Sequence, residues 1–193
     1  MERHGLVLIV AIGESIVVIG VDAAGLAVDL PLVLVAILGL ALSACLWWTY
    51  FGGDDARAEE ALAAAPRARR PRLAIDAFGY AHFLLLLGIV AIAAAQKKAI
   101  GHAFDPLSFE ASLGFGAGLA VFLAGDVLFR RSLAIGRTDV RLSAALLALA
   151  TVPLGTEVAA VAQLAALVAL MAAMFALENA AVSQSPTAVE GVP

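Results

Sequence analysis

Residues 5–21 read GLVLIVAIGESIVVIGV, an apolar run with a single charged side chain, Glu14. The run predicts a helix that crosses a bilayer, because a hydrocarbon core about 30 Å thick takes about 20 residues of helix. A helix is required because it pairs its own backbone amides, which would otherwise be unsatisfied in lipid. The whole chain fits this interpretation: of 193 residues, 63% are hydrophobic and 15% charged, against roughly 45–50% and 25% in soluble domains.

Five further apolar runs follow, and together they predict an all-α, polytopic membrane helix bundle of about six transmembrane helices over residues 1–180. The predicted spans are residues 5–21, 30–51, 73–95, 109–129, 140–153 and 156–177. Pro153 and Gly155 lead us to expect a fifth span that is short, tilted or broken. Residues 52–72 form a polar connection in which 56–65 are a candidate surface helix. Residues 181–193 are expected to be a flexible cytoplasmic tail.

The positive residues predict an orientation, because cytoplasmic loops carry the excess of Lys and Arg. Lys97 and Lys98 fall on one side of the six-span arrangement, and the other ten of the twelve Lys and Arg residues fall on the opposite side. These ten are Arg3, Arg57, Arg67, Arg69, Arg70, Arg72, Arg130, Arg131, Arg137 and Arg141. Both termini are therefore predicted to be cytoplasmic. The alternative for the first span, a signal peptide cleaved near residues 24–27, is disfavoured by the acidic residue within the apolar segment.

Two titratable side chains are predicted near the middle of the membrane. Glu14 lies about ten residues into the first span, and His82 lies at a similar depth in the third. We expect Glu14 and His82 to approach one another, directly or through water, with Ser15 and Tyr80 as nearby hydroxyls. One interpretation is a proton or ion path, which intramembrane ionisable groups often mark. The other is a polar cross-link that holds two helices in register.

The remaining acidic residues of the spans have structural explanations. Asp126 lies one turn before Arg130, which predicts an ion pair at the cytoplasmic boundary. Asp76, near the cytoplasmic end of the third span, is expected to reach water. Glu110 and Glu157 begin the fourth and sixth spans, where a carboxylate suits the positive end of the helix dipole.

Small residues mark one face of the fourth span. Gly114 and Gly118 have the GxxxG spacing that lets two helix backbones approach closely. This face is predicted to pack against another span or against another subunit.

Several classes of function are disfavoured by the sequence. Cys45 is the only cysteine, so neither an internal disulfide nor a thiolate metal cluster is possible. The spacing of His and carboxylate residues indicates no metal site, and no cofactor is expected. No nucleophile elbow or phosphate-binding loop occurs, so we expect no enzymatic activity and assign no catalytic residue. The net charge of −4, with scattered positive residues, argues against nucleic acid as a partner.

Two segments resemble a known family. Residues 2–16, with Glu2-Arg-His-Gly-Leu and Gly13-Glu-Ser-Ile, and residues 80–90, with Tyr80-Ala-His and Gly88-Ile-Val, are similar to segments of the bacterial low temperature requirement A (LtrA) membrane proteins. The Trp47-Trp48-x-Tyr50-Phe51 end of the second span also fits. The resemblance implies an integral protein of the inner (plasma) membrane, associated with growth at low temperature and without an established biochemical activity.

The resemblance is to the later half of such proteins only, since their usual first span is not found. It leaves open a truncated product, a fragment, or a half-size protein that assembles as a homo-oligomer or with a missing amino-terminal half.

The leading hypothesis is proton-coupled or ion transport through the polar Glu14 and His82 pair. The rival hypothesis is a non-transporting membrane scaffold or assembly subunit that uses the face at Gly114 and Gly118. A membrane-embedded enzyme acting on lipid ranks last, because no nucleophile and base are visible.

Overall fold

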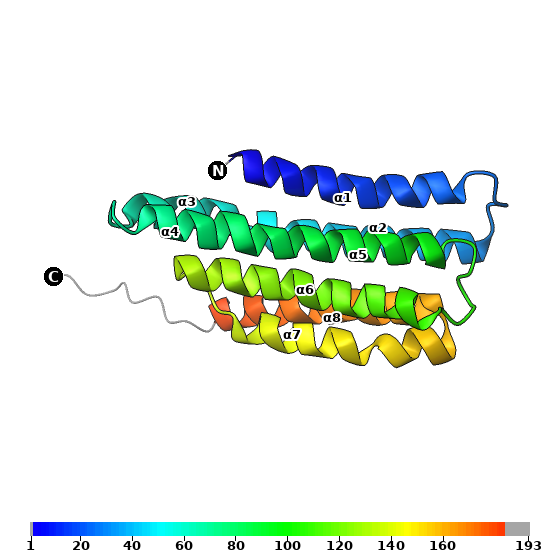
Figure 1. Ribbon diagram of the computed structural model, residues 1–193. Helices are drawn as coiled ribbons and strands as arrows, with labels where there is room; N and C mark the ends of the chain where they lie inside the picture. Colours follow the sequence, from blue (N-terminus) through cyan, green and yellow to red (C-terminus); the bar gives the residue numbers. More distant parts are fainter. Residues whose placement is uncertain (1, 184–193) are drawn as a thin grey trace.

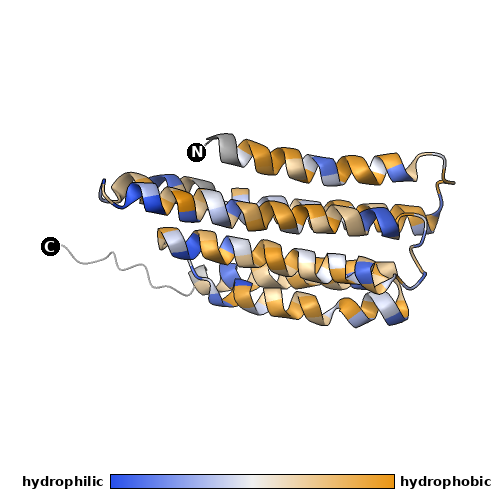
Figure 2. Ribbon diagram, in the orientation of Figure 1, coloured by the Kyte–Doolittle hydropathy of each residue, from blue (hydrophilic) through white to orange (hydrophobic). Residues whose placement is uncertain are grey.

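The computed structural model describes residues 2–183, and these fold into helices without any strand. Within this range, six helical segments are long and apolar enough to cross a membrane. They lie side by side with their axes nearly aligned (Figure 1), and apolar residues dominate their lengths (Figure 2). The predicted fold class, an all-α bundle of about six membrane helices, is confirmed.

The helices alternate with short connections. In chain order they are α1 (Glu2–Ala23), α2 (Leu30–Phe51), α3 (Asp54–Ala64), α4 (Arg70–Ala74), the π-helix η1 (Ile75–Ala81), α5 (His82–Ala99), α6 (Phe109–Leu133), α7 (Asp139–Ala150), the π-helix η2 (Leu154–Val158) and α8 (Ala160–Ser183). The candidate surface helix of the polar connection is present as α3. The third span is longer than predicted, because α4, η1 and α5 form one continuous helical segment, Arg70–Ala99.

The boundary between the fifth and sixth spans differs from the prediction. Residues 156–158, predicted to begin the sixth span, belong to η2 and end the fifth, and α8 begins only at Ala160. The connection between α5 and α6 explains this break: Leu107 N donates to Gly155 O at 2.8 Å, and Ala160 N donates to Asp105 O at 3.1 Å. These bonds satisfy backbone groups on both sides of the break, which a continuous helix would otherwise pair within itself.

The tail prediction is partly corrected as well. Residues 181–183 continue α8, and the rest of the predicted tail, residues 184–193, lies outside the described residues.

Helix α6 is the most buried of the six candidate spans: 61% of the residues in its most apolar 18-residue stretch are buried inside the bundle. Phe115, Phe122 and Phe129 recur every seven residues along it and are fully buried. They place one face of α6 in the core, since residues seven apart lie on the same side of a helix. Helix α5 packs along α6, and α7 packs on another side of it. Helices α1 and α7 lie at opposite edges of the bundle, and α8 lies behind α6 and α7 and packs against α2 (Figure 1).

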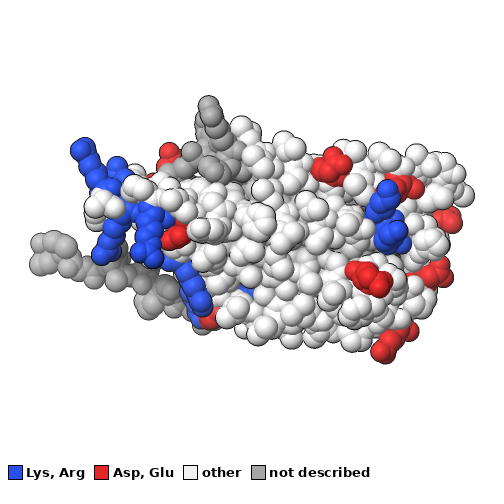
Figure 3. Space-filling model, viewed as in Figure 1, with Lys and Arg blue, Asp and Glu red and all other residues white. Residues whose placement is uncertain are grey.

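The positive side chains gather at one end of the bundle. Figure 3 shows Lys and Arg concentrated at the end where α3, α4 and the α6–α7 connection lie, with a smaller group at the opposite end. We call the first the basic end. It is the end at which the candidate site lies.

Candidate functional site

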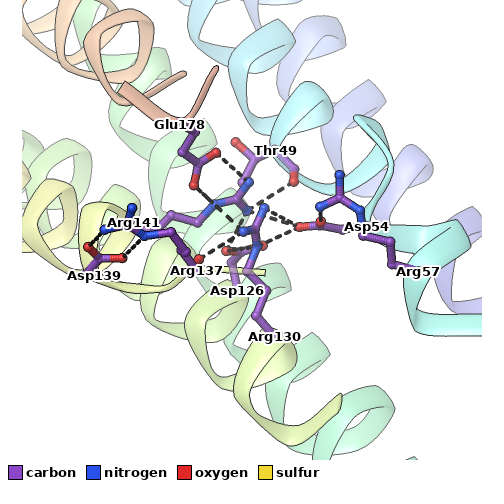
Figure 4. A network of polar contacts seen from close by, with 9 residues as sticks. All are labelled: Thr49, Asp54, Arg57, Asp126, Arg130, Arg137, Asp139, Arg141 and Glu178. Carbon is purple, nitrogen blue, oxygen red and sulfur yellow. Dashed lines mark hydrogen bonds and ion pairs between the residues drawn. The ribbon is translucent and has the colours of Figure 1, made fainter. Parts of the chain in front are cut away.

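A network of buried charged side chains lies at the basic end and joins four helices (Figure 4). Its members are Asp54 of α3, Asp126 and Arg130 of α6, Arg141 of α7 and Glu178 of α8. All except Glu178 are buried, and Asp126 is 0% exposed. We refer to these five residues as the ion network.

Arg141 is the centre of the ion network. Its Nη1 donates to Asp126 Oδ2 at 2.7 Å and to Asp54 Oδ2 at 3.4 Å. Its Nε and Nη2 donate to the two carboxylate oxygens of Glu178, at 2.8 and 3.1 Å. Such two-point pairing of a guanidinium with a carboxylate is strong and directional. One side chain of α7 therefore holds α3, α6 and α8 together.

Arg141 also serves the end of α2. Its Nη1 donates to the backbone oxygen of Thr49 at 3.2 Å. Thr49 lies in the last turn of α2, where backbone carbonyls have no partner within the helix. A positive charge at this position is also favoured by the negative end of the helix dipole.

Arg130 makes the second set of contacts. Its Nε and Nη2 each lie 2.7 Å from Asp54 Oδ2, and its Nε lies 3.6 Å from Asp126 Oδ2. The ion pair between Asp126 and Arg130 predicted from their spacing is therefore present. The prediction placed it at the water boundary, however, and Asp126 is enclosed because α7 brings Arg141 against it.

The connection between α6 and α7 is shaped around Arg130. Arg130 Nη1 donates to the backbone oxygen of Arg137 at 3.0 Å. Gly136 has a φ of +62°, and a Cβ there would lie 2.7 Å from Arg130 Nη1. Glycine is favoured at this position because it accepts a positive φ and leaves room for the guanidinium.

The ion network contains more acidic than basic groups, because two guanidinium groups face three carboxylates. Arg57 adds a third positive charge at the edge of the network: its Nη1 lies 3.3 Å from Asp54 Oδ1, and its side chain is 55% exposed. Asp126 Oδ1 is buried and has no hydrogen-bond partner among the described residues. Buried carboxylate oxygens are usually bonded, so this oxygen is the place in the network where a proton can bind without displacing an arginine.

A cavity of about 290 Å³ adjoins the ion network. Asp54, Arg130, Arg141 and Glu178 line it, and Arg57, Arg137 and Asn179 contribute further polar groups. Trp48 and Phe175 form part of its apolar wall. Among the described residues, no three His, Cys, Asp or Glu side chains are grouped so that they could hold a metal ion.

His82 belongs to a separate buried cluster. Its Nε2 lies 3.1 Å from the Tyr50 hydroxyl and its Nδ1 lies 2.9 Å from the backbone oxygen of Ala77. In the neutral tautomer with Nδ1–H donating to Ala77, the Tyr50 hydroxyl donates to Nε2. The rings of Phe78 and Phe129 lie 5.4 and 5.6 Å from the His82 ring. Tyr50 and Phe129 are the chain neighbours of Thr49 and Arg130, so this cluster adjoins the ion network.

No hydrogen bond or ion pair joins Glu14 to His82 in the described part of the chain, so the predicted direct contact is not seen. Glu14 is exposed on α1, whereas His82 is 4% exposed and faces Tyr50 of α2. Tyr80 is 63% exposed. Depth along a helix can be counted from the sequence, but the direction of a side chain depends on how the helix is rotated in the bundle.

Ser15 lies on the buried side of α1, in a third polar cluster. Its Oγ lies 3.0 Å from Ser43 Oγ of α2 and donates to the Ile12 backbone oxygen at 2.6 Å. Gln96 Nε2 of α5 donates to the Gly39 backbone oxygen at 3.1 Å. These contacts link α1, α2 and α5.

Gly114 and Gly118 lie against α5 of the same chain. A Cβ at Gly118 would lie 3.1 Å from the backbone oxygen of Gly88, and one at Gly114 would lie 3.1 Å from the Cβ of Ala95. Of the two alternatives for this face, the structure shows the one within the chain.

Sequence reasoning missed most of the ion network. Asp54 was assigned to a polar connection, Glu178 was not singled out, and Arg141 was used only for orientation. A usable signal was present: acidic residues recur near the ends of the second, fourth and sixth spans on the side of the six-span arrangement that holds the arginines. In a membrane protein such residues tend to pair with one another.

Comparison with known proteins identifies a family for the chain. Searches of curated proteins and of solved structures found no similar protein. A family model described as bacterial low temperature requirement A protein (LtrA) matches residues 1–176. This match runs through nearly the whole chain and covers every member of the ion network except Glu178. It gives no support to the expectation that only the later half of the family is represented. The chain is a multi-pass membrane protein that belongs to the bacterial LtrA family.

Proposed function

We propose that this protein transports protons, or an ion coupled to protons, and that Asp126 of the ion network carries the transported or coupling proton. The observation that carries the proposal is the unpartnered Oδ1 of Asp126, a fully buried carboxylate within a candidate membrane span. Ionisable groups within membrane spans are costly and often lie on ion or proton pathways. The proposal includes no enzymatic step.

The charge balance of the ion network supports this role for Asp126. With Asp126 neutral, Arg130 and Arg141 face two carboxylates, those of Asp54 and Glu178. With Asp126 ionised, the same two arginines face three. Binding and release of one proton thus changes the net charge of a site in which electrostatic interactions are strong, because the surroundings have a low dielectric constant.

The position of the network supports a coupling mechanism. Arg141 contacts Asp126 of α6, Glu178 of α8 and the end of α2. Protonation of Asp126 weakens its attraction to Arg141, which frees that guanidinium to favour its other partners on α2, α3 and α8. Binding or release of one proton thereby changes the relative stability of the contacts between helices. Alternating access requires such a shift between two arrangements of the helices.

The cavity beside the ion network supplies access in this proposal. It is lined by network members and by exposed arginines of the basic end. In the orientation proposed from the positive residues, this end and both termini face the cytoplasm. Asp126 would then exchange its proton with the cytoplasm.

Proton flux into liposomes tests the proposal. Wild-type protein is expected to dissipate an imposed pH gradient, and Asp126→Asn, which keeps the size of the side chain and cannot carry the proton, is expected to lower the rate to background. Asp139→Asn is the matched control, because Asp139 pairs with Arg137 in an exposed position at the same end. Background flux in the wild type, or equal flux in wild type and Asp126→Asn, would overturn the proposal.

The second candidate is the non-transporting scaffold. The observation that favours it is the packing of α6. Phe115 and Phe122, which precede Asp126 on this helix, are fully buried in the core between the ion network and the opposite end of the bundle. In a scaffold, the ion network would serve only to hold the helices together. The scaffold hypothesis therefore predicts that Asp126→Asn changes the stability of the protein and leaves a background proton leak unchanged.

A further inference from the structure

The outer face of α1 carries an acidic residue in the middle of a membrane span. Glu14 lies nine residues from each end of the candidate span Gly5–Ala23. Glu14 is exposed, and its carboxyl group makes no hydrogen bond or ion pair with any other described residue. Figure 2 shows hydrophilic colour near the middle of α1 between apolar segments. Contact of such a group with lipid tails is costly.

The residues around Glu14 form a regular stripe. Val7, Val10, Val17 and Val21 are 50, 71, 54 and 64% exposed. Together with Glu14 they follow the three-and-four spacing of the seam between two packed helices. The opposite face of α1, with Leu8, Ile12, Ser15 and Ile19, is the buried one. The five residues Val7, Val10, Glu14, Val17 and Val21 are called the α1 seam below.

The backbone beside the α1 seam is open. Gly13 and Gly20, seven residues apart, have no atom within 4 Å of the position a Cβ would take. By contrast, a Cβ at Gly88 or Gly118 in the interior would meet a neighbouring backbone. Small residues on a membrane helix allow a second helix to approach closely.

We propose that the α1 seam is the interface with a second copy of this chain, in which the two Glu14 side chains meet and share hydrogen bonds. Two copies inserted in the same orientation are related by an axis normal to the membrane, so equivalent residues lie at equal depth. Glu14 of one copy then faces Glu14 of the other. A carboxylic acid group both donates and accepts, so a pair of them is self-complementary and requires no other partner.

The α1 seam also has residue types that suit a helix–helix interface. Valine is β-branched and stiff, and one polar residue among such apolar positions fixes the register of the packed helices. This inference concerns assembly and does not rest on the proposed transport function.

Cysteine cross-linking in membranes tests the interface. Cys45 is the only cysteine, so Cys45→Ala gives a background without thiols. In this background Val10→Cys and Val17→Cys are expected to form a disulfide-linked dimer on oxidation. The matched control is Leu146→Cys, at a residue 65% exposed on α7, which lies across the bundle from α1 (Figure 1). We expect at least a tenfold higher yield at the two seam positions than at the control.

Energy transfer between labelled copies, followed as the protein is diluted with lipid, tests the role of Glu14. Glu14→Leu is expected to weaken association about tenfold, the scale of an interhelical polar contact in membranes. Glu14→Gln, whose amide also donates and accepts, is expected to stay close to wild type. If Glu14→Leu does not reach the membrane, the two seam cysteines decide.

Three results would overturn the proposal: a monomer at every dilution, equal cross-linking at Leu146→Cys and the seam positions, or cross-linking of the seam only to a different protein.

Discussion

Arg141 Nη1 lies 2.7 Å from Asp126 Oδ2, and both side chains are buried within candidate membrane spans. This contact brings α7 against α6 at a point where each helix carries a charge that lipid cannot accommodate. Removal of Arg141 leaves the buried Asp126 with only its longer contact to Arg130, at 3.6 Å. A buried charge with too little compensation costs more than the ion pair itself contributes.

Arg141→Met is therefore expected to lower the free energy of unfolding by about 3–5 kcal/mol. The double variant Asp126→Leu/Arg141→Met should recover a large part of that loss, because the buried carboxylate of Asp126 is then removed together with its closest cation. Reversible denaturation in mixed micelles measures both. Arg137→Met, at the exposed pair with Asp139, is the control and should change little. Equal losses for the single and the double variant would contradict this account of the contact.

Gly88→Ala is expected to destabilise the bundle by about 1–3 kcal/mol. A Cβ at Gly88 would lie 2.6 Å from the backbone oxygen of Gly118 and 2.7 Å from the Phe122 Cβ, so α5 and α6 would have to move apart. Gly79→Ala provides the comparison, since its Cβ would come no closer than 3.9 Å to a neighbouring side chain, that of Ile75. The fraction of folded protein after heating in detergent reports the difference. Similar behaviour of the two variants would count against close packing of α5 and α6.

The two tyrosines of the chain provide a matched pair of tests. Tyr50→Phe removes the hydroxyl that bonds His82 Nε2, and a buried hydrogen bond of this kind contributes about 0.5–1.5 kcal/mol. Tyr80→Phe removes a hydroxyl from a side chain that is 63% exposed and should leave stability nearly unchanged. Thermal unfolding of both variants in one detergent makes the comparison. The reverse order of stabilities would refute the assignment of Tyr50 as the partner of His82.

The proposed orientation predicts opposite outcomes for two reporter fusions. A fusion after Arg137, between α6 and α7, should report the cytoplasm, and a fusion after Gln96, near the end of α5, should report the outside. The physical reason is the concentration of positive residues at the basic end (Figure 3), because cytoplasmic loops carry the excess of Lys and Arg. A reporter after Arg137 that is active only outside the cytoplasm would reverse the orientation.

The sequence was sufficient for the bundle and for local contacts. Apolar runs of span length predicted the helices, and the four-residue spacing of Asp126 and Arg130 predicted their ion pair. It was not sufficient for contacts between distant parts of the chain. Arg130 bonds Asp54 across 76 positions, and Arg141 bonds Thr49 across 92. No local period indicates such pairings, because they depend on which helices become neighbours.

Glu14 illustrates a second reason why contacts between helices could not be predicted from the sequence. Its depth followed from counting residues, yet Ile12 and Ser15 on either side of it are buried while Glu14 is exposed. Rotation of a helix about its axis is set by packing against its neighbours, and in lipid the apolar outer face has no pattern that distinguishes it from an apolar core. The sequence therefore identified an unusual residue but could not predict which face of the helix carries it.

The exchange of a proton at Asp126 is the central claim, and infrared difference spectroscopy tests it most directly. Wild-type protein in lipid should show the carbonyl band of a protonated carboxylic acid that grows on acidification, and this component should be missing from Asp126→Asn and retained in Asp139→Asn. An identical set of carboxylic acid bands in wild type and Asp126→Asn at every pH would contradict the claim, because Asp126 would then hold no exchangeable proton.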